Sequence, residues 1–455
     1  MADYAKIFKA YDVRGVVPDE LDEGVAEAVG AAFATMTGAP AVAIVHDMRT
    51  SSVPLAAAFA RGATSAGTDV VDGGLGSTDM LYYASGSLGI PGAMLTASHN
   101  PAKYNGIKLC LAGAKPVGQD TGLAEIRDLA SSGVHVAAST PGTVQRKDLL
   151  SGYADYLKAL VDLSGIRPLK VVVDAGNGMA GHTVPKVFDG LPIETVPLYF
   201  ELDGSFPNHE ANPIDPANLA DLQRAVIASA ADIGLAFDGD ADRCFVVDER
   251  GEIVSPSVLT ALIAVRELAR EPGASVIHNL ITSRAVPEIV AEHGGTAVRT
   301  RVGHSFIKAV MAERGAIFGG EHSGHFYFRD FWFADSGMLA ALHVLAALGG
   351  QDGPLSELLS QYSRYVASGE INSEVSDQAG ATAKVREAFS GRPGISFDEL
   401  DGLTGTCPHW WFNLRPSNTE PLLRLNVEAE DHATLAKVTD EVLHIVRDAT
   451  TLENR

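Results

Sequence analysis

The sequence predicts an α/β protein with three related α/β domains with mixed sheets and a smaller C-terminal α+β domain, arranged around a central cleft. Short β-branched runs alternate with alanine-rich helical runs along most of the chain, which is typical of repeated α/β layers. At 455 residues the chain is too long for one hydrophobic core, and about 100 to 150 residues per domain gives three or four domains.

The elements that carry this prediction are strands followed closely by helices. The clearest pairs are a strand at 41–46 with a helix at 54–66, a strand at 169–174 with a helix at 183–188, and a strand at 274–279 with a helix at 285–293. Strand-like runs around Arg415 and a helical run at 433–447 indicate the smaller last unit. The predicted domains are 1–145, 146–250, 251–367 and 368–455.

The charge of the chain excludes some partners. A formal net charge of −22 without a basic block disfavours nucleic acid. An anionic substrate would then need a local basic site, and we expect four cations to converge there: Arg14, Lys108, Arg243 and Arg415.

Cysteine usage and hydropathy predict a cytoplasmic location. Cys110, Cys244 and Cys407 are odd in number and lie in apolar, strand-like settings, as buried thiols in a reducing compartment do. The N-terminus lacks the charged and apolar regions of a signal peptide. No run approaches the roughly 18 apolar residues that cross a membrane.

The most informative string is an acidic loop in which Asp238, Asp240 and Asp242 alternate with small residues and precede Arg243. Strand-like runs at 233–237 and 244–247 hold this loop at both ends. Crowded carboxylates repel one another, whereas a divalent cation uses all three as oxygen ligands. The alternative is a solvated acidic turn, which the apolar flanks disfavour.

A calcium-binding hand is a second alternative for this loop. The aspartates fall at loop positions one, three and five, and Glu249 falls at position twelve. Position six is Arg243 instead of glycine, however, and the flanks are strand-like instead of helical. Magnesium is therefore the expected ion, and because it is usually held by few carboxylates and a phosphate oxygen, a phosphate is the natural further ligand.

Three further strings are weak when taken singly. The small-residue loop 96–101 contains Ser98, a candidate nucleophile or phosphate carrier, although such loops are also ordinary turns. The string 415–421 offers an arginine fork and hydroxyl and amide donors suited to a dianion, although a polar hairpin loop has the same composition. The string 319–325 combines glycines with donors and acceptors suited to sugar hydroxyls.

Together, in this chain order, the four strings resemble the α-D-phosphohexomutase family. That family has a phosphoserine loop, a metal loop, a sugar-binding loop and a phosphate-binding loop in the same order. Segments 8–15, 105–108 and 302–308 are similar to the family too, so the resemblance spans nearly the whole chain.

The resemblance implies a role for each matching residue. Ser98 would be the phosphorylated serine, and its phosphate would complete a magnesium shell with Asp238, Asp240 and Asp242. Arg14 and Arg243 would hold the transferring phosphoryl group, with His99 and Lys108 beside it. The residues that would bind the substrate are Tyr11, His304, Glu321, Ser323, His325, Arg415, Ser417, Asn418 and Thr419.

Lys108 is the first choice for the proton shuttle. Neighbouring cations and partial burial would lower its pKa toward neutrality, which suits general acid and base work on a sugar hydroxyl. A surface lysine on a strand is the alternative.

The implied reaction is the interconversion of mannose 6-phosphate and mannose 1-phosphate through phospho-Ser98, with Mg²⁺ as cofactor and a hexose 1,6-bisphosphate as intermediate and activator. Asn418 resembles the phosphomannomutase/phosphoglucomutase branch, whereas phosphoglucosamine mutases usually carry glycine there. Two positions depart from that branch: His322 stands where it commonly has methionine, and a lysine found in some relatives is replaced near Ile281. Both departures bear on the choice between mannose and glucose. Phosphoglucomutase activity, or dual specificity, is the alternative.

Two readings from other classes remain open. The string 176–181 matches the dinucleotide fingerprint and Glu194 lies near the distance of a ribose-binding acid, which would indicate an NAD-binding oxidoreductase. A tight strand-to-helix turn has the same composition. A non-catalytic sugar-phosphate binder is the other reading, against which Ser98, Lys108 and the three aspartates argue together.

Overall fold

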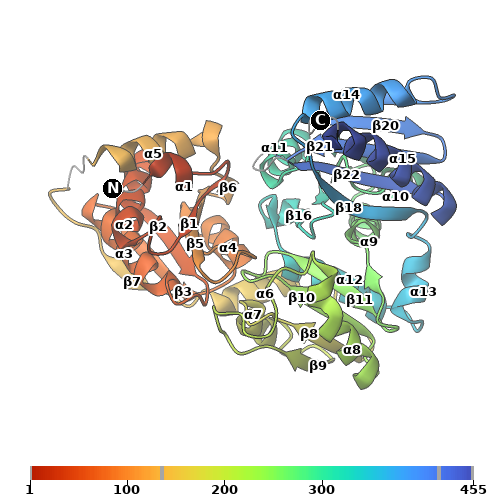
Figure 1. Ribbon diagram of the computed structural model, residues 1–455. Helices are drawn as coiled ribbons and strands as arrows, with labels where there is room; N and C mark the ends of the chain where they lie inside the picture. The colour runs from red at the N-terminus through yellow and green to blue at the C-terminus, as the bar shows by residue number, and fades with distance from the viewer. Residues whose placement is uncertain (1–2, 134–137, 418–421, 452–455) are drawn as a thin grey trace.

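The computed structural model describes residues 3–133, 138–417 and 422–451, and these residues form four β-sheets with their helices (Figure 1). The N-terminal sheet, in red and orange, lies at the left of Figure 1 and the C-terminal sheet, in blue, at the upper right, with the second sheet, which contains β8 and β10, below them. The first three sheets are mixed and the fourth is antiparallel. The predicted fold class, three α/β domains and a C-terminal α+β domain, is confirmed.

The first three sheets share one topology. In each, one strand (β2, β8 or β13) lies between two parallel neighbours. An antiparallel strand (β5, β11 or β16) then pairs with the later of those two neighbours. The strand orders are β1-β5-β4-β2-β3-β7, β12-β11-β10-β8-β9 and β14-β13-β15-β16-β17. The fourth sheet has the order β18-β22-β21-β20-β19.

The strands are short and mostly buried. In the first sheet they are β1 Asp12–Val16, β2 Ala41–His46, β3 Asp69–Leu75, β4 Gly92–Leu95, β5 Tyr104–Leu111, β6 Lys115–Pro116 and β7 Val144–Arg146. In the second they are β8 Leu169–Asp174, β9 Ile193–Leu198, β10 Ile233–Phe237, β11 Cys244–Asp248 and β12 Ile253–Val254. The third and fourth sheets contain β13 Ser275–Asn279, β14 Thr296–Thr300, β15 Phe318–Gly320, β16 Phe326–Phe328, β17 Ala334–Asp335, β18 Val366–Glu374, β19 Ser396–Asp398, β20 Leu403–Cys407, β21 Trp410–Pro416 and β22 Leu422–Ala429.

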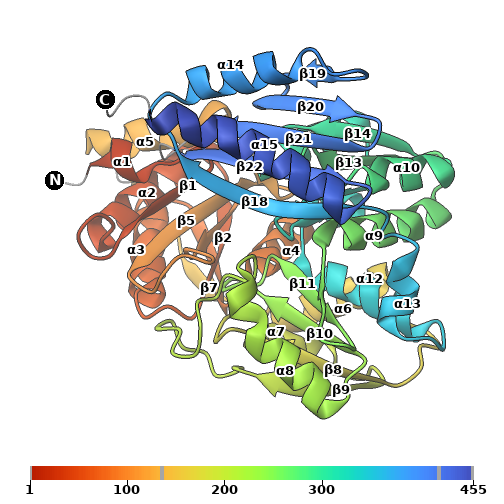
Figure 2. The ribbon, with the colours of Figure 1, turned by 45° about the vertical axis from the view of Figure 1, so that its right-hand side comes forward.

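Helices cover these sheets, and several begin at side-chain caps. Asp22, Ser77 and Ser336 each accept a backbone N–H in the first turn of their helix. In the first two domains the helices are α1 Tyr4–Ile7, α2 Glu23–Thr37, α3 Ser52–Ser65, α4 Thr78–Leu88, α5 Leu123–Ser132, α6 Leu150–Leu160, α7 Ala180–Val187 and α8 Ala220–Ser229. The rest are α9 Pro256–Arg270, α10 Ala285–Glu292, α11 His304–Arg314, α12 Gly337–Gly349, α13 Leu355–Ser360, α14 Gln378–Phe389 and α15 His432–Thr451, which lies along β18 and β22 (Figure 2).

The shared topology puts three of the predicted motifs at equivalent places. The turn that leads into the antiparallel strand contains Ser98 in the first sheet (β4 to β5), the three aspartates in the second (β10 to β11) and Glu321–His325 in the third (β15 to β16). The hairpin between β21 and β22 begins with Arg415 and Pro416 at the end of its first strand. Equivalent turns of three similar layers, and one hairpin of a fourth, therefore supply the candidate site.

The hydrophobic core continues across the first three domains but not into the fourth. One cluster joins Met80 of α4, Tyr153 of α6 and Leu339 of α12. The C-terminal domain has a separate core around Phe412, and it meets the third domain through a small cluster of Leu280, Ile281 and Trp411.

Candidate active site

The three aspartates of the acidic loop lie together and are buried. Asp238, Asp240 and Asp242 are each at most 1% exposed, and each offers a carboxylate oxygen within 4.8 Å of the others. Burial and the neighbouring carboxylates Asp242 and Asp240 raise the pKa of Asp238 well above its usual value. The loop is thus a concentration of negative charge that requires cations.

Ser98 lies beside this loop, although 140 positions separate it from Asp238 in the sequence. Its hydroxyl donates to Asp238 Oδ2 at 2.8 Å. Ser98 adopts a left-handed backbone conformation with φ of 51°, which is uncommon for a residue with a side chain and is found where the surroundings impose it. The predicted phosphoserine and the predicted metal ligands are therefore neighbours.

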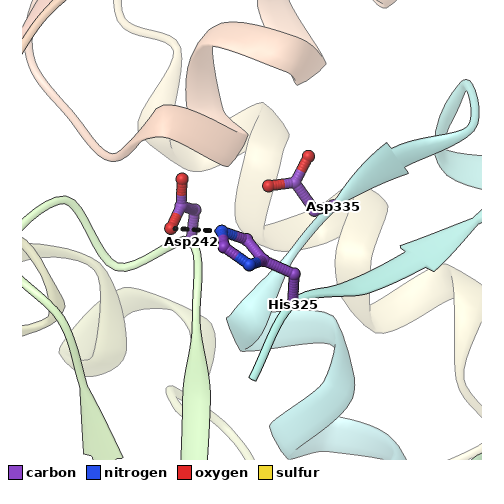
Figure 3. Close-up of side chains that lie close together, drawn as sticks. All are labelled: Asp242, His325 and Asp335. Atoms are coloured by element: carbon purple, nitrogen blue, oxygen red, sulfur yellow. Dashed lines mark ion pairs between the residues drawn. The ribbon is translucent and has the colours of Figure 1, made fainter. Parts of the chain in front are cut away.

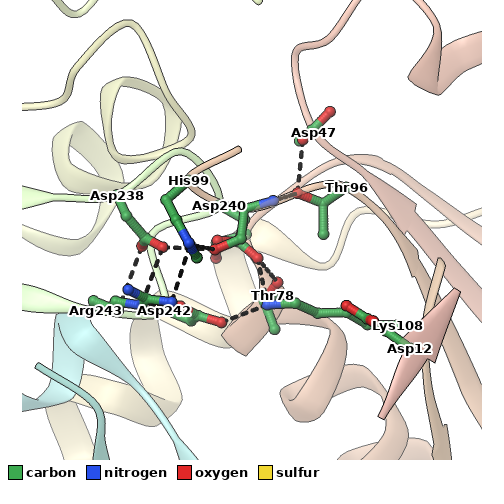
Figure 4. Close-up of polar contacts among 12 residues, drawn as sticks. Asp12, Asp47, Thr78, Thr96, His99, Lys108, Asp238, Asp240, Asp242 and Arg243 are labelled. Carbon is green, nitrogen blue, oxygen red and sulfur yellow. Dashed lines mark hydrogen bonds and ion pairs between the residues drawn. The ribbon is translucent and has the colours of Figure 1, made fainter. Parts of the chain in front are cut away.

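Lys108 contacts the same carboxylates from β5. Its Nζ is 2.6 Å from Asp240 Oδ2 and 2.6 Å from Asp242 Oδ2, as Figure 4 shows. Burial opposes its charge, but Asp240 and Asp242 raise the pKa of Lys108 above its ordinary value. The expectation that neighbouring cations lower this pKa is therefore wrong: the nearest groups are carboxylates, and in this state Lys108 is an ammonium ion.

His99 lies among cations. Arg243 Nη2 is 3.0 Å from His99 Nδ1, and Ser98 Oγ is 3.3 Å from the same atom. Arg243, burial and Arg14 lower the pKa of His99 to about 2, so its imidazole is neutral.

Arg14 comes from β1, whose antiparallel pairing with β5 places Asp12 opposite Lys108. It contacts the side chain of Asn100 and pairs with Asp12 at 2.5 Å. Arg14, Lys108 and Arg243 thus meet around the Ser98 loop, whereas Arg415, the fourth cation expected to converge there, pairs with Glu370 in the C-terminal domain.

Thr78, at the first position of α4, was not predicted. Its hydroxyl donates to Asp240 Oδ2 at 2.5 Å and its backbone N–H to the Asp240 carbonyl at 3.0 Å. A Ser-Thr-Asp string at 77–79 is an ordinary helix start, so only the tertiary structure reveals this contact.

The sugar-loop residues form a local network. Ser323 Oγ lies 3.0 Å from Glu321 Oε2 and 3.0 Å from His325 Nδ1, and Tyr327 donates to Glu321 Oε1 at 2.7 Å. His325 Nε2 is also 3.6 Å from Asp242 Oδ1, with Asp335 beside them (Figure 3). His325 therefore joins the predicted sugar loop to the acidic loop.

The predicted phosphate clamp contains a second arginine. Arg415 Nη2 is 2.6 Å from Glu370 Oε2, and Arg424 Nη1 is 3.5 Å from the other oxygen of the same carboxylate. Among the described residues, Arg415 Nη1 and Arg424 Nε are buried without a hydrogen-bond partner. Two arginines that share one carboxylate leave a net positive charge and unused donors, which suit a phosphate dianion.

Arg424 was missed, although a signal exists in the sequence. The run 422–427 alternates in the manner of a strand, and Arg424 pairs with Arg415 in register across the hairpin. Arg424 Nη2 also lies 3.5 Å from Ser417 Oγ.

The remaining predicted residues are placed less fully. The Tyr11 hydroxyl lies 3.2 Å from the position that a Cβ on Gly303 would take, so the first domain meets the segment that precedes α11. His304 begins α11, but its side chain is outside the described part of the structure, as are Asn418 and Thr419. Burial, with smaller contributions from Arg415 and Arg243, lowers the pKa of His322 to about 3, so its imidazole is neutral.

The glycine string 176–181 forms a structural turn. A Cβ on Gly178 would lie 2.7 Å from the Gly239 carbonyl oxygen, and Met179 N donates to that oxygen at 2.9 Å. Glu194 pairs with Lys170 on the sheet surface. The turn therefore packs against the acidic loop, where a dinucleotide would require open space.

The carboxylates fit a divalent cation. Oδ1 of Asp240 and Oδ1 of Asp242 are buried and have no hydrogen-bond partner among the described residues. Hard cations take such oxygens as ligands.

Within the described residues, no helix combines the length and the apolar character that crossing a bilayer requires. Cys110, Cys244 and Cys407 are buried and free.

Family models and relatives match this chain over nearly its whole length. Four models of the phosphoglucomutase/phosphomannomutase family match in order: α/β/α domain I at 5–134, domain II at 151–251, domain III at 256–365 and the C-terminal domain at 370–445. A phosphomannomutase of Escherichia coli is 40% identical in an alignment of 451 residues that covers 97% of this chain and 99% of the relative.

Two other relatives extend the likeness. A protein of Xanthomonas campestris pv. campestris named phosphohexose mutases is 41% identical over 444 residues, covering 97% of this chain and 99% of the relative. The crystal structure of a phosphoglucomutase/phosphomannomutase family protein from Burkholderia thailandensis superposes with a TM-score of 0.89 at 34% identity, covering 99% of this chain and 98% of the other. Since the family models cover most of the chain and these relatives span it, the protein is an enzyme of the phosphoglucomutase/phosphomannomutase family of mutases.

Proposed function

We propose that the protein interconverts mannose 6-phosphate and mannose 1-phosphate through a phosphorylated Ser98 and a hexose 1,6-bisphosphate that remains in the site and turns around. The observation that carries this proposal is the 2.8 Å contact between Ser98 Oγ and Asp238 Oδ2. Asp238 belongs to the group of carboxylates that also pairs with Lys108 and Arg243. A serine with only a structural role does not need three buried aspartates and three basic side chains around it.

In the proposed step, a sugar hydroxyl oxygen forms a bond to the phosphorus of phospho-Ser98 while the bond between phosphorus and Oγ breaks. Lys108, an ammonium ion in this state, gives a proton to Oγ and receives the hydroxyl proton, so it ends as it began. Arg14 and Arg243 would stabilise the charge on the moving group, because electrostatic stabilisation is the main requirement of phosphoryl transfer. The second transfer reverses these events on the other end of the bisphosphate.

Mg²⁺ is the proposed cofactor, held by Asp238, Asp240, Asp242 and the Ser98 phosphate. When bound, it would supply positive charge beside the transferring group. A hexose 1,6-bisphosphate is the proposed activator, because it would phosphorylate Ser98 in enzyme that has lost its phosphate.

The other phosphate of the substrate is proposed to bind at Arg415 and Arg424. Glu321, Ser323 and His325 would contact the sugar between the two ends. The segments that contain His304, Asn418 and Thr419 are proposed as further binding elements from the sequence alone. The domain limits 145, 250 and 367 and a cytoplasmic location stay predictions.

We propose mannose phosphates as the first substrates because the relatives that span the chain include proteins named phosphomannomutase. Glucose phosphates are the second candidate. The name of the Xanthomonas relative, phosphohexose mutases, does not restrict that protein to one hexose.

Purified protein with Mg²⁺ and a trace of glucose 1,6-bisphosphate tests the proposal. Turnover of mannose 1-phosphate above that of glucose 1-phosphate, with phosphate on Ser98 by mass spectrometry, is the expected result. A lack of turnover on both sugars by enzyme that carries phospho-Ser98 would overturn it.

A further inference from the structure

Arg49 is a fully buried arginine that neither the sequence motifs nor the proposed reaction uses. It lies in the segment between β2 and α3 and is 1% exposed. A buried guanidinium is costly unless its donors are satisfied, so its partners indicate what it does.

The partners of Arg49 are almost all backbone carbonyls of the Ser98 loop. Nη2 donates to Ser98 O at 2.8 Å and to Asn100 O at 2.7 Å. Nη1 donates to Pro101 O at 3.0 Å and to Tyr104 O at 3.0 Å. Nε donates to Asp47 Oδ2 at 3.2 Å. Every N–H of the guanidinium is used, and four of the five hold the loop.

Asp47 holds this arginine and also reaches the loop by a second route. It is fully buried and accepts from Ser52 Oγ at 2.5 Å and from Thr96 Oγ1 at 2.7 Å. Thr96 Oγ1 in turn accepts the backbone N–H of Ser98 at 2.9 Å. The amide and the carbonyl of Ser98 are thus both tied to one buried ion pair.

The second domain closes this arrangement. A Cβ on Gly239 of the acidic loop would lie 2.5 Å from Ser98 O, the same carbonyl that Arg49 holds. The ring of Phe206 lies over the guanidinium, with Arg49 Cζ 5.0 Å from its centroid. The position of Ser98 relative to Asp238 therefore depends on Arg49 and on the contact between two domains.

We propose that Arg49, oriented by Asp47, is a positioning residue for phosphoryl transfer. It holds Ser98 in its left-handed conformation, with φ of 51°, and so directs Oγ toward Asp238. Arginine is required because its planar fork reaches four carbonyls at once, which the single ammonium group of lysine cannot do. This inference rests on the proposed function for its kinetic consequence but not for its structural one.

The experiment compares wild-type protein with Arg49→Lys and with Arg167→Lys as a matched control. Arg167 also donates to backbone carbonyls and to an aspartate, Asp232, but these partners lie away from the site. For Arg49→Lys we expect kcat to fall about 100-fold, the loss that misplacement by about 1 Å produces, with KM changed less than about threefold. Phosphorylation of Ser98 by glucose 1,6-bisphosphate should slow by the same factor as kcat, and Arg167→Lys should retain wild-type values.

Hydrogen exchange in peptides covering 96–105 provides a readout that needs no substrate. Exchange there should be faster in Arg49→Lys than in wild-type protein, with other peptides unchanged. If wild-type protein turns over no hexose phosphate, the proposed function fails. The exchange comparison still tests whether Arg49 holds the Ser98 loop. Unchanged exchange in 96–105, or an unchanged kcat in an active enzyme, would overturn the inference.

Thr96→Val supplies a second variant if Arg49→Lys fails to fold. It removes the hydroxyl between Asp47 and the Ser98 amide while keeping the shape of the side chain. We expect kcat to fall about tenfold, the effect of one lost buried hydrogen bond, and Thr96→Ser to restore it. Equal kcat and equal exchange in Thr96→Val and wild-type protein would contradict the proposal.

Discussion

The two ends of the candidate site are built differently. At the Ser98 end, Ser98 and the three aspartates are at most 2% exposed, two domains meet, and the core beneath continues through α4, α6 and α12. The Arg415 end belongs to a domain with its own core, attached to the third domain through Leu280, Ile281 and Trp411. Bonds would form and break at the Ser98 end, which requires a fixed geometry. At the Arg415 end a phosphate would only be bound, which requires positive charge. The comparison therefore predicts that changes at the first end alter kcat and changes at the second alter binding.

Ser98→Ala should have the largest effect at the first end of the site. Removing the proposed phosphate carrier should lower turnover roughly 10⁴-fold or more, as the loss of a nucleophile does in other enzymes, while the calorimetric Kd for mannose 1-phosphate stays within about threefold. Ser51→Ala, at a nearby serine whose hydroxyl accepts from Asn105, serves as control. Retained activity of Ser98→Ala would end the phosphoserine mechanism.

Arg415→Met should act at the other end. Loss of a buried fork that pairs with Glu370 should raise KM and Kd about 100-fold, with a smaller effect on kcat. Arg424→Met should be milder, about tenfold, because its side chain is 33% exposed against 7% for Arg415.

The control for the clamp is Arg392→Met in the same domain, where Arg392 pairs with Glu441 on the helical side. Equal KM values for Arg415→Met and Arg392→Met would remove the clamp assignment.

Thr78→Val sharpens the account of the first end. Without its hydroxyl, Asp240 Oδ2 loses one donor while Lys108 remains, and the Mg²⁺ concentration for half-maximal activity should rise about tenfold, as for other groups that orient metal ligands. Thr78→Ser should restore the wild-type value. Identical Mg²⁺ dependence in Thr78→Val would show that Asp240 is oriented by other contacts.

Asp79→Asn tests the buried hydrogen bonds between α4, α6 and the start of α12, which lie beneath the Ser98 end. Asp79 accepts hydroxyl donors from Ser77, Tyr153 and Ser336, and burial raises its pKa from 3.8 to about 7. Because the folded-state pKa is the higher one, the carboxyl favours folding most below about pH 4, and this contribution is lost as pH rises to about 7.

The melting temperature of wild-type protein minus that of Asp79→Asn should therefore fall by several degrees between pH 4 and 7 and be constant above. A difference that does not vary with pH would show that Asp79 stays ionised throughout. Turnover at pH 8 should be the same in both proteins.

Much of the fold could be predicted from local patterns. The strand predicted at 169–174 is β8, and the helix predicted at 285–293 is α10, Ala285–Glu292. The helix predicted at 183–188 begins earlier, at Ala180, because the glycine turn before it continues directly into the helix. Periodicity predicts such elements, but it does not locate ends that tertiary packing determines.

The candidate site was predictable where its residues cluster in the sequence, and not where single residues act at a distance. The partners of Lys108 lie 132 and 134 positions further along, so its raised pKa could not be inferred from its neighbours. Arg49 acts on backbone carbonyls, which no side-chain pattern records. The domain limits stay predictions.

The equivalent turns of the first three sheets have a consequence for how this enzyme can be divided. The serine, the carboxylates and the sugar-loop residues each lie on a different layer, so no separated domain contains a complete set of reacting groups. If cleavage of a peptide bond in a connecting segment lets the domains separate, the enzyme should lose activity as it would on loss of a catalytic side chain. This holds even if every domain stays folded. Activity is a property of the assembled chain, and its loss on limited proteolysis should precede any loss of helix content.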